Sequence, residues 1–198
     1  CWGSNYNGES SAVPTLANPV AVSAGGGHVC ALDDTGVHCW GENYSGESTV
    51  PTLSNPIAVS AGGDHTCAVD STGVHCWGFN DYGQTTVPSL SYPIEVSAGS
   101  NHTCALDDTG VHCWGAGLTI NAAMDYEYGQ SIVPILSHPI AVSAGGNHTC
   151  ALDDMGVHCW GNNNYGQTTV PSLSHPIAVS AGGINTCALD DTGVHCWG

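Results

Sequence analysis

The stretch that decides the fold is Ser143-Ala-Gly-Gly-Asn-His-Thr-Cys-Ala-Leu-Asp-Asp-Met-Gly-Val-His-Cys-Trp-Gly161, because versions of it recur along the whole chain. Its last three residues, Cys-Trp-Gly, also begin at Cys1, Cys39, Cys76, Cys113 and Cys196. The successive starts are 38, 37, 37, 46 and 37 residues apart. A short unit with a nearly fixed period indicates a repeat architecture, in which each unit packs on its neighbours. We therefore expect one repeat domain over residues 1–198, with repeats 1–38, 39–75, 76–112, 113–158 and 159–198.

Each repeat is expected to form three short β-strands and a long loop. In the fourth copy, the alternating apolar residues of Pro139–Gly145 predict a first strand, and His148–Leu152 predicts a second. Asp153–Gly156 predicts a turn, because Asp can bond its own backbone and Gly can adopt a positive φ. Val157–Gly161 then predicts a third strand. No segment shows a sustained helical period, so the predicted fold class is all-β.

The eleven cysteines fall into two series, since one further Cys lies nine residues before each Cys-Trp-Gly except the first. A four-residue loop over Asp33–Gly36 would place Cys30 directly opposite Cys39. Opposed residues of an antiparallel pair have α-carbons about 4.5–5.5 Å apart, which a disulfide can span. A three-residue loop with a glycine bulge would forbid the bond, but the constant spacing favours the first loop. The predicted disulfides are Cys30–Cys39, Cys67–Cys76, Cys104–Cys113, Cys150–Cys159 and Cys187–Cys196.

Cys1 is left over from this pairing. Three explanations compete: the chain is cut from a longer array, Cys1 bonds another chain, or it is a free thiol. By phase, Cys1 is the second cysteine of a hairpin whose first half would lie upstream, so we favour the first explanation.

Charge and cysteine content bound the partners and the compartment. The chain has no Lys and no Arg against 17 acidic residues, so nucleic-acid binding and attraction to an anionic membrane surface are not expected. No stretch is long and apolar enough to span a membrane. Cysteines in regular register indicate an oxidising compartment, and we expect an extracellular, secreted protein. Three Asn-x-Ser/Thr sequons are candidate N-glycosylation sites: Asn43, Asn101 and Asn147.

The repeated string resembles the RCC1 repeat, most closely its short, cysteine-bearing bacterial and extracellular versions. The matching elements are Ala144-Gly145-Gly146 with His148, Ala151-Leu152, Gly156, Trp160-Gly161 and Tyr165-Gly166-Gln167. The resemblance covers essentially the whole chain and implies a β-propeller, usually of seven blades. Five copies depart from that number, although propellers of about four to eight blades exist. Because Cys-Trp-Gly stands at both ends, an open, propeller-like superhelical array is expected at least as much as a closed ring.

Asp pairs mark the expected hairpin tips of four copies, and the second copy has Asp70-Ser71 instead. We expect exposed, turn-forming and solubilising residues there. Paired carboxylates could also bind Ca²⁺, the one cofactor considered. Catalytic carboxylates need unlike environments, which equivalent exposed turns do not provide. The calcium candidates are Asp33, Asp34, Asp107, Asp108, Asp153, Asp154, Asp190 and Asp191.

Two further residue types recur along the chain. The histidine before each first hairpin cysteine could join Cys in a zinc site, but hairpin disulfides would occupy the cysteines. The fifth copy has Asn185 at that position, which favours a packing or hydrogen-bonding role over a ligand role. The tryptophans could stack on a ligand, although one aromatic residue per repeat more often forms core between repeats.

No motif for catalysis stands out, and nearly equivalent copies argue against one specialised site, so we do not expect an enzyme. The leading hypothesis is an extracellular structural protein that self-associates into a fibre or surface appendage. The alternative is a secreted, RCC1-like protein-binding module. A nine-residue insertion within residues 116–127 of the fourth copy could contact a protein partner, because function often lies on loops that interrupt a repeat.

Overall fold

A computed structural model describes residues 1–119 and 126–198 as five three-stranded antiparallel sheets, with no helix in these ranges. Each sheet consists of three consecutive strands and is called a blade, numbered one to five along the chain. The blades are β1 (Ala21–Ala24), β2 (His28–Asp33) and β3 (Gly36–Gly41); β4 (Ala58–Ala61), β5 (His65–Asp70) and β6 (Gly73–Gly78); β7 (Glu95–Ala98), β8 (His102–Asp107) and β9 (Gly110–Gly115); β10 (Ala141–Ala144), β11 (His148–Asp153) and β12 (Gly156–Gly161); β13 (Ala178–Ala181), β14 (Thr186–Asp190) and β15 (Gly193–Trp197).

Within each blade the second and third strands form a tight hairpin stapled by a disulfide. In blade one Leu32 faces Val37 and Cys30 faces Cys39, which is the register that the four-residue loop requires. The disulfides are Cys30–Cys39, Cys67–Cys76, Cys104–Cys113, Cys150–Cys159 and Cys187–Cys196, each with α-carbons 4.1 Å apart. Cys1 is free and exposed. Cys39 lies in β3, the third strand of blade one. A sequence repeat that begins at Cys39 therefore starts in the middle of a hairpin, and the boundaries of the sequence repeats differ from those of the blades.

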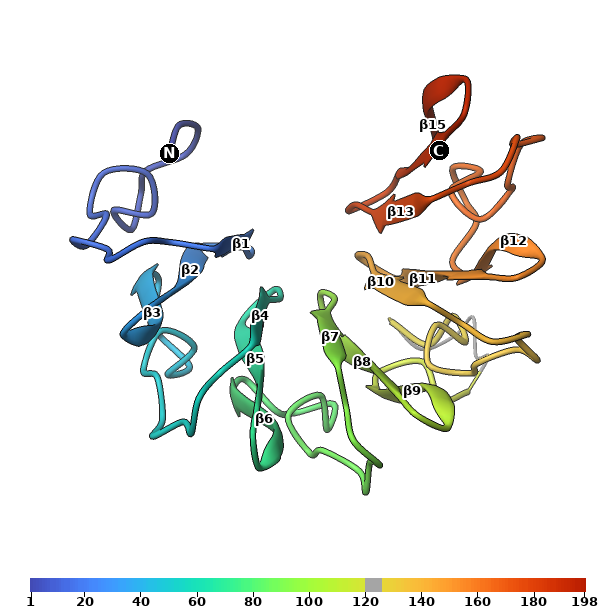
Figure 1. Ribbon diagram of the computed structural model, residues 1–198. Coiled ribbons are helices and arrows are strands. Elements are labelled where there is room, and N and C mark those ends of the chain that lie inside the picture. Colours follow the sequence, from blue (N-terminus) through green and yellow to red (C-terminus); the bar gives the residue numbers. More distant parts are fainter. Residues whose placement is uncertain (120–125) are drawn as a thin grey trace.

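The blades fan out in an open arc around a common centre (Figure 1). The innermost strands β1, β4, β7, β10 and β13 contact one another in sequence order. The turns after them converge on the middle and line a hollow of about 290 Å³, which we call the hub. The connectors between blades lie at the outer rim, and blades one and five stand at the two ends of the arc (Figure 1).

Neighbouring blades meet at the hub so closely that only small residues fit. Gly63 N–H donates to Gly99 O of the next blade at 3.0 Å, and Ala98 N–H donates to Ser60 Oγ at 3.0 Å. A Cβ on Gly62 would lie 2.5 Å from the Gly99 carbonyl oxygen. The repeated Ser-Ala-Gly-Gly is therefore the sequence that lets two backbones approach each other.

Apolar side chains and the loop after each blade complete these seams. Cys104 and Leu106 of blade three pack against Val142 and Ala144 of blade four, so the core lies between blades as well as within them. The Trp114 indole N–H donates to Gln84 O of the loop from the preceding blade at 2.9 Å. Trp40 and Trp114 are buried, as a core residue should be, whereas Trp2 is 95% exposed.

A buried histidine crosses each of the four seams. His65 Nε2 lies 2.8 Å from Thr103 Oγ1 of the next blade, and Thr103 donates its own proton to Gln84 O at 2.8 Å. Thr103 must therefore accept from His65, which assigns the ring proton to Nε2 and leaves Nδ1 neutral and without a partner. The same pairs are His28–Thr66, His102–Thr149 and His148–Thr186. In the first four copies this position therefore forms a hydrogen bond across the seam.

Burial lowers the pKa of these histidines, because a charged ring would be poorly solvated there. The pKa of His65 and of His148 falls to about 4, and that of His102, which also faces His65 and His148, falls to about 3. The two ends of the array differ from this pattern. Blade one has Val29 where the others have Thr, and blade five has the exposed Asn185 where the others have His.

We predict that Gly62→Ala destabilises the fold, because the new Cβ meets the Gly99 carbonyl and the His65 ring carbon Cε1 at 2.5 and 2.6 Å. Overpacking of this kind costs about 1–3 kcal/mol. The matched control is Gly182→Ala in blade five, where the Cβ would lie 2.6 Å from the Asn185 side chain, which is exposed and can move away, and 3.3 Å from the nearest backbone atom. Urea unfolding followed by circular dichroism checks both variants. Equal midpoints for the two would contradict the hub packing described here.

We also predict a loss of thermal stability on acidification. The seam histidines have a lower pKa in the folded chain than the ordinary value of 6.5, so the unfolded chain binds protons first. The stability that they contribute is complete above pH 6.5 and is lost between pH 6.5 and about 4, at up to about 1.4 kcal/mol per pH unit per histidine.

Calorimetry over this pH range checks the prediction as a falling Tm. His102→Gln should flatten the slope, because it removes the deepest of these histidines. The control His175→Gln removes an exposed ring and should leave the slope as in the parent protein. A parent Tm that is constant over the range would show that the seams do not depend on neutral histidine.

Candidate functional site

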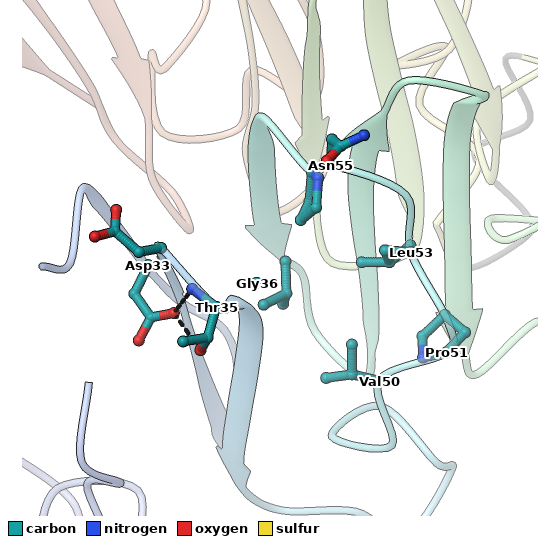
Figure 2. Close-up of a pocket in the computed structure, with 10 residues that line it drawn as sticks. Asp33, Thr35, Gly36, Val50, Pro51, Leu53 and Asn55 are labelled. Carbon is teal, nitrogen blue, oxygen red and sulfur yellow. Dashed lines mark hydrogen bonds between the residues drawn. The ribbon is translucent and has the colours of Figure 1, made fainter. Parts of the chain in front are cut away.

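Two grooves of the same build lie at the rim, each between the hairpin tip of one blade and the connector to the next. The first has a volume of about 580 Å³ and is lined by Asp33–Val37 and by residues from Val50 to Pro56. Figure 2 shows Val50 and Leu53 of the connector opposite Gly36 of the tip. The second has a volume of about 640 Å³ and repeats the arrangement with Asp70–Val74 and residues 87–94. The groove is thus a product of the repeat and belongs to two blades at once.

The first Asp of each tip is a structural residue that ties the tip to its own connector. The Asp33 side chain is 1% exposed, and its carboxylate accepts from Ala17 N–H at 2.6 Å and from Thr35 N–H and Oγ1 at 2.7 Å each. His38 Nε2 lies 3.1 Å from the same carboxylate. The bond from Ala17, and then that from the Thr35 hydroxyl, lowers the pKa of Asp33 well below its ordinary value. The bond from the connector amide is repeated in the other four blades, at Asp70, Asp107, Asp153 and Asp190. Blade four lacks the hydroxyl donor, because Met155 stands where the other tips have Thr.

The expectation that both residues of each Asp pair are exposed is therefore wrong for the first residue. Asp33, Asp107, Asp153 and Asp190 are buried, and only Asp34, Asp108, Asp154 and Asp191 are exposed. The tip sequence resembles an ordinary polar turn, and the donor that buries Asp33 comes from 16 residues upstream. Hydrogen bonds keep these buried carboxylates ionised, whereas a proton donor would need a raised pKa, so the first residue of each pair is not suited to donate a proton.

This arrangement leaves the calcium candidates few carboxylate oxygens that are free to bind a metal ion. The buried carboxylates already accept several hydrogen bonds, and Asp34 Oδ2 accepts from Asn18 Nδ2 at 2.6 Å. Within residues 1–119 and 126–198, no group of three or more His, Cys, Asp or Glu side chains is placed to hold a metal ion. Calcium binding stays a prediction that would rest on the exposed second residue of each pair.

The three sequons occupy different environments. Asn43 is exposed in the loop after β3, where its side chain accepts from Ser48 N–H at 2.9 Å. Asn101 and Asn147 are half-buried, and the Thr residues of their sequons, Thr103 and Thr149, are the fully buried acceptors of the seam histidines. Glycosylation stays a prediction, and Asn43 is the site with the most accessible surroundings.

The insertion within residues 116–127 is described only at its two ends, since residues 120–125 lie outside the described ranges. Glu127 accepts from Thr119 Oγ1 at 2.7 Å and from Thr119 N–H at 3.1 Å, which joins the two ends. The Tyr126 ring packs edge to face on Tyr82 of the preceding loop, with centroids 5.5 Å apart. A partner contact through this insertion stays a prediction.

Solved structures with the same fold include two receptor-kinase ectodomains and a yeast protein. The ectodomain of the Physcomitrella patens receptor kinase CR4 is 23% identical over 92% of this chain, with a TM-score of 0.72. The CRINKLY WD40 ectodomain of the Arabidopsis thaliana receptor kinase ACR4 is 25% identical over 95%, also with a TM-score of 0.72. Prp20p from Saccharomyces cerevisiae is 20% identical over 90%, with a TM-score of 0.71. The chain spans 54%, 68% and 56% of these three proteins, respectively.

No helix that could cross a membrane occurs in the part of the chain that the structure describes.

Comparison with family models identifies the family of the chain, although no curated protein matches it. The family described as Regulator of chromosome condensation (RCC1) repeat matches four segments, residues 20–47, 57–84, 94–118 and 140–167, each running from a first strand into the loop after its hairpin. Together these segments cover more than half of the sequence, and the chain belongs to the RCC1 repeat family.

Proposed function

We propose that the chain is a non-catalytic protein-binding module that holds its partner along the rim. The observation that carries this proposal is the groove between tip and connector, which two successive seams repeat with residues at equivalent positions. A row of equivalent grooves on a firmly joined arc suits a partner that makes several similar contacts. Related structures support the idea by analogy: that of Prp20p is described with its binding to Gsp1p and histones, and yeast RCC1 was solved bound to Kap60.

The chemistry of the groove suits a polypeptide better than a small metabolite. Val50, Pro51 and Leu53 give one wall an aliphatic surface, while Asp34 and Asn55 supply polar groups to the lining. Such a mixture can bury an apolar side chain and still bond the polar backbone beside it. The tips have the same design in every blade and their buried carboxylates stay ionised, so no blade is set apart as a catalytic centre.

An extracellular location is part of the proposal. Five disulfides persist best in an oxidising compartment, and two of the similar structures are receptor ectodomains. Prp20p shows that the fold alone does not fix the compartment, because that protein binds histones. The disulfides, rather than the fold, therefore support the location.

We predict that filling one groove removes most of the partner binding. Val50→Trp and Val87→Trp place a bulky ring in the first and second groove, and Asn164→Trp places the same ring on an exposed loop as the control. The three variants and the parent serve as bait for proteins of the source's extracellular medium, after circular dichroism has shown that each is folded. We expect a stoichiometric partner with the parent and the control, and a loss of most of it with either groove variant. Equal capture by all four, or no stoichiometric partner with the parent, would overturn the proposal.

A second proposal is end-to-end self-association into a fibre. Val22 of blade one is 69% exposed, whereas its equivalents Val96 and Val142 are buried against the preceding blade. Leu189 of blade five is 38% exposed, whereas its equivalent Leu152 is 1% exposed. The two ends therefore expose the apolar halves of a seam. The seam would lack its histidine bond, since Val29 and Asn185 would meet there.

For this second proposal we predict a mass that rises with concentration. Static light scattering should show assemblies larger than one chain, and micrographs of the same samples should show filaments. Leu189→Glu places a charge on the exposed end and should return the mass to that of one chain. A parent protein that stays a monomer at every concentration would exclude end-to-end assembly of this chain.

A further inference from the structure

The connectors hold one exposed residue each in the left-handed region, where glycine is the least strained choice. These residues are Asn18, Asn55, Tyr92, His138 and His175, with φ between 50° and 54°. Asn and His are tolerated at such angles, but Tyr is strained there. Turn geometry alone therefore accounts for Asn or His at this position, but not for Tyr. The side chain of Tyr92 needs another explanation, since strain of this kind is retained where a side chain is used.

Three of these residues, Asn18, His138 and His175, bond the second residue of their own hairpin tip. His138 Nδ1 lies 2.8 Å from Asp154 Oδ2, and both side chains remain open to solvent, at 85% and 59% exposed. His175 and Asp191 repeat this pair at 2.9 Å. Tyr92 is 83% exposed and lines the second groove, as Asn55 lines the first. The variable residue thus stands at the groove while the aliphatic wall stays the same from copy to copy.

An exposed aliphatic residue lies two positions further along every connector. We call these five residues, together with the five left-handed ones, the rim row. The aliphatic members are 62–73% exposed: Val20, Ile57, Ile94, Ile140 and Ile177. Because one such side chain recurs at the same position of every connector, the series can offer an elongated partner one apolar contact per blade.

Charge decides what kind of macromolecule fits. The chain carries 17 acidic residues and no Lys or Arg, and the rim row is accompanied by the exposed carboxylates of Asp34, Asp108, Asp154 and Asp191. Such a surface attracts cations and repels an acidic partner. We propose that the rim row binds an extended cationic polypeptide segment, with Lys or Arg at the tip carboxylates and apolar side chains on the aliphatic residues. The left-handed residue of each blade then selects which side chain the adjoining groove accepts.

This inference rests on the proposed binding function and is tested separately from it. The probe is a fluorescent peptide of alternating Lys and Leu, titrated by anisotropy into the full chain, with a Glu–Leu peptide as the charge-reversed control. Asp154→Asn with Asp191→Asn removes two rim carboxylates, and Asp64→Asn with Asp81→Asn removes two exposed carboxylates elsewhere. Both double variants change the net charge equally.

We expect the rim double variant to weaken binding of the Lys–Leu peptide about fivefold, the value for two partly exposed ion pairs, and the control double variant to change it by less than about twofold. Equal weakening by both would show general attraction to an acidic protein and would overturn the proposal. Failure of the Lys–Leu peptide to bind the parent, or equal binding of the Glu–Leu peptide, would overturn it as well. None of these outcomes would decide the proposed binding function, which the groove variants test separately with the natural partner.

The left-handed position has its own test in Tyr92→Gly. Glycine fits φ of 51° without strain, so the Tm should be equal to or above that of the parent. Peptide binding should nevertheless weaken several-fold, because the side chain that the strain retains is gone. Unchanged binding would show that Tyr92 serves the turn alone and would overturn its role in selection. Tyr92→His introduces the residue that the fourth and fifth connectors have at this position, and this variant should bind the peptide better than Tyr92→Gly but less well than the parent.

Discussion

The structure depends on one constraint, which is the close approach of the backbones of neighbouring blades at the hub. Glycine amides donate to glycine carbonyls of the next blade, as in Gly26 N to Gly62 O and Gly146 N to Gly182 O, at 3.0 and 2.9 Å. A side chain larger than hydrogen at Gly62 would meet the next backbone. The histidine–threonine bond and the bond from tryptophan to the loop carbonyl then hold the same seam further out. Three-stranded sheets as short as these would be marginal alone, and the seam makes them one structure.

The proposed binding surface follows from this seam, since each groove has one wall from each of two blades. Residues at the seam and residues in the connector differ in how much they vary among the copies. Positions at the seam are nearly invariant among the copies, and the exposed position in the connector changes from Asn to Tyr to His. A scaffold that repeats its geometry while varying one exposed residue per blade can present a sequence of different contacts along one line.

Much of this architecture could be predicted from the sequence, because the signals were local. Alternating apolar residues predicted the strands, and the nine-residue cysteine spacing predicted the register of the hairpins. The burial of Asp33 could not be predicted, since its donor Ala17 comes from the connector. The histidine bonds join residues at least 38 positions apart, so no local pattern indicates their partner. The grooves are formed by the seam geometry, and the only local signal for the left-handed connector residues was the proline that follows each of them.

Hydrogen exchange of the native chain tests most directly whether the seams make the blades one structure. The account predicts that the amides of Gly26, Gly63 and Gly146, which donate across the hub, exchange as slowly as the amides within the sheets. Gly183 holds the same position in blade five, has no later blade to bond within the described chain, and should exchange fast. Fast exchange at all four glycines, with the sheets still protected, would contradict the account and show five independent blades.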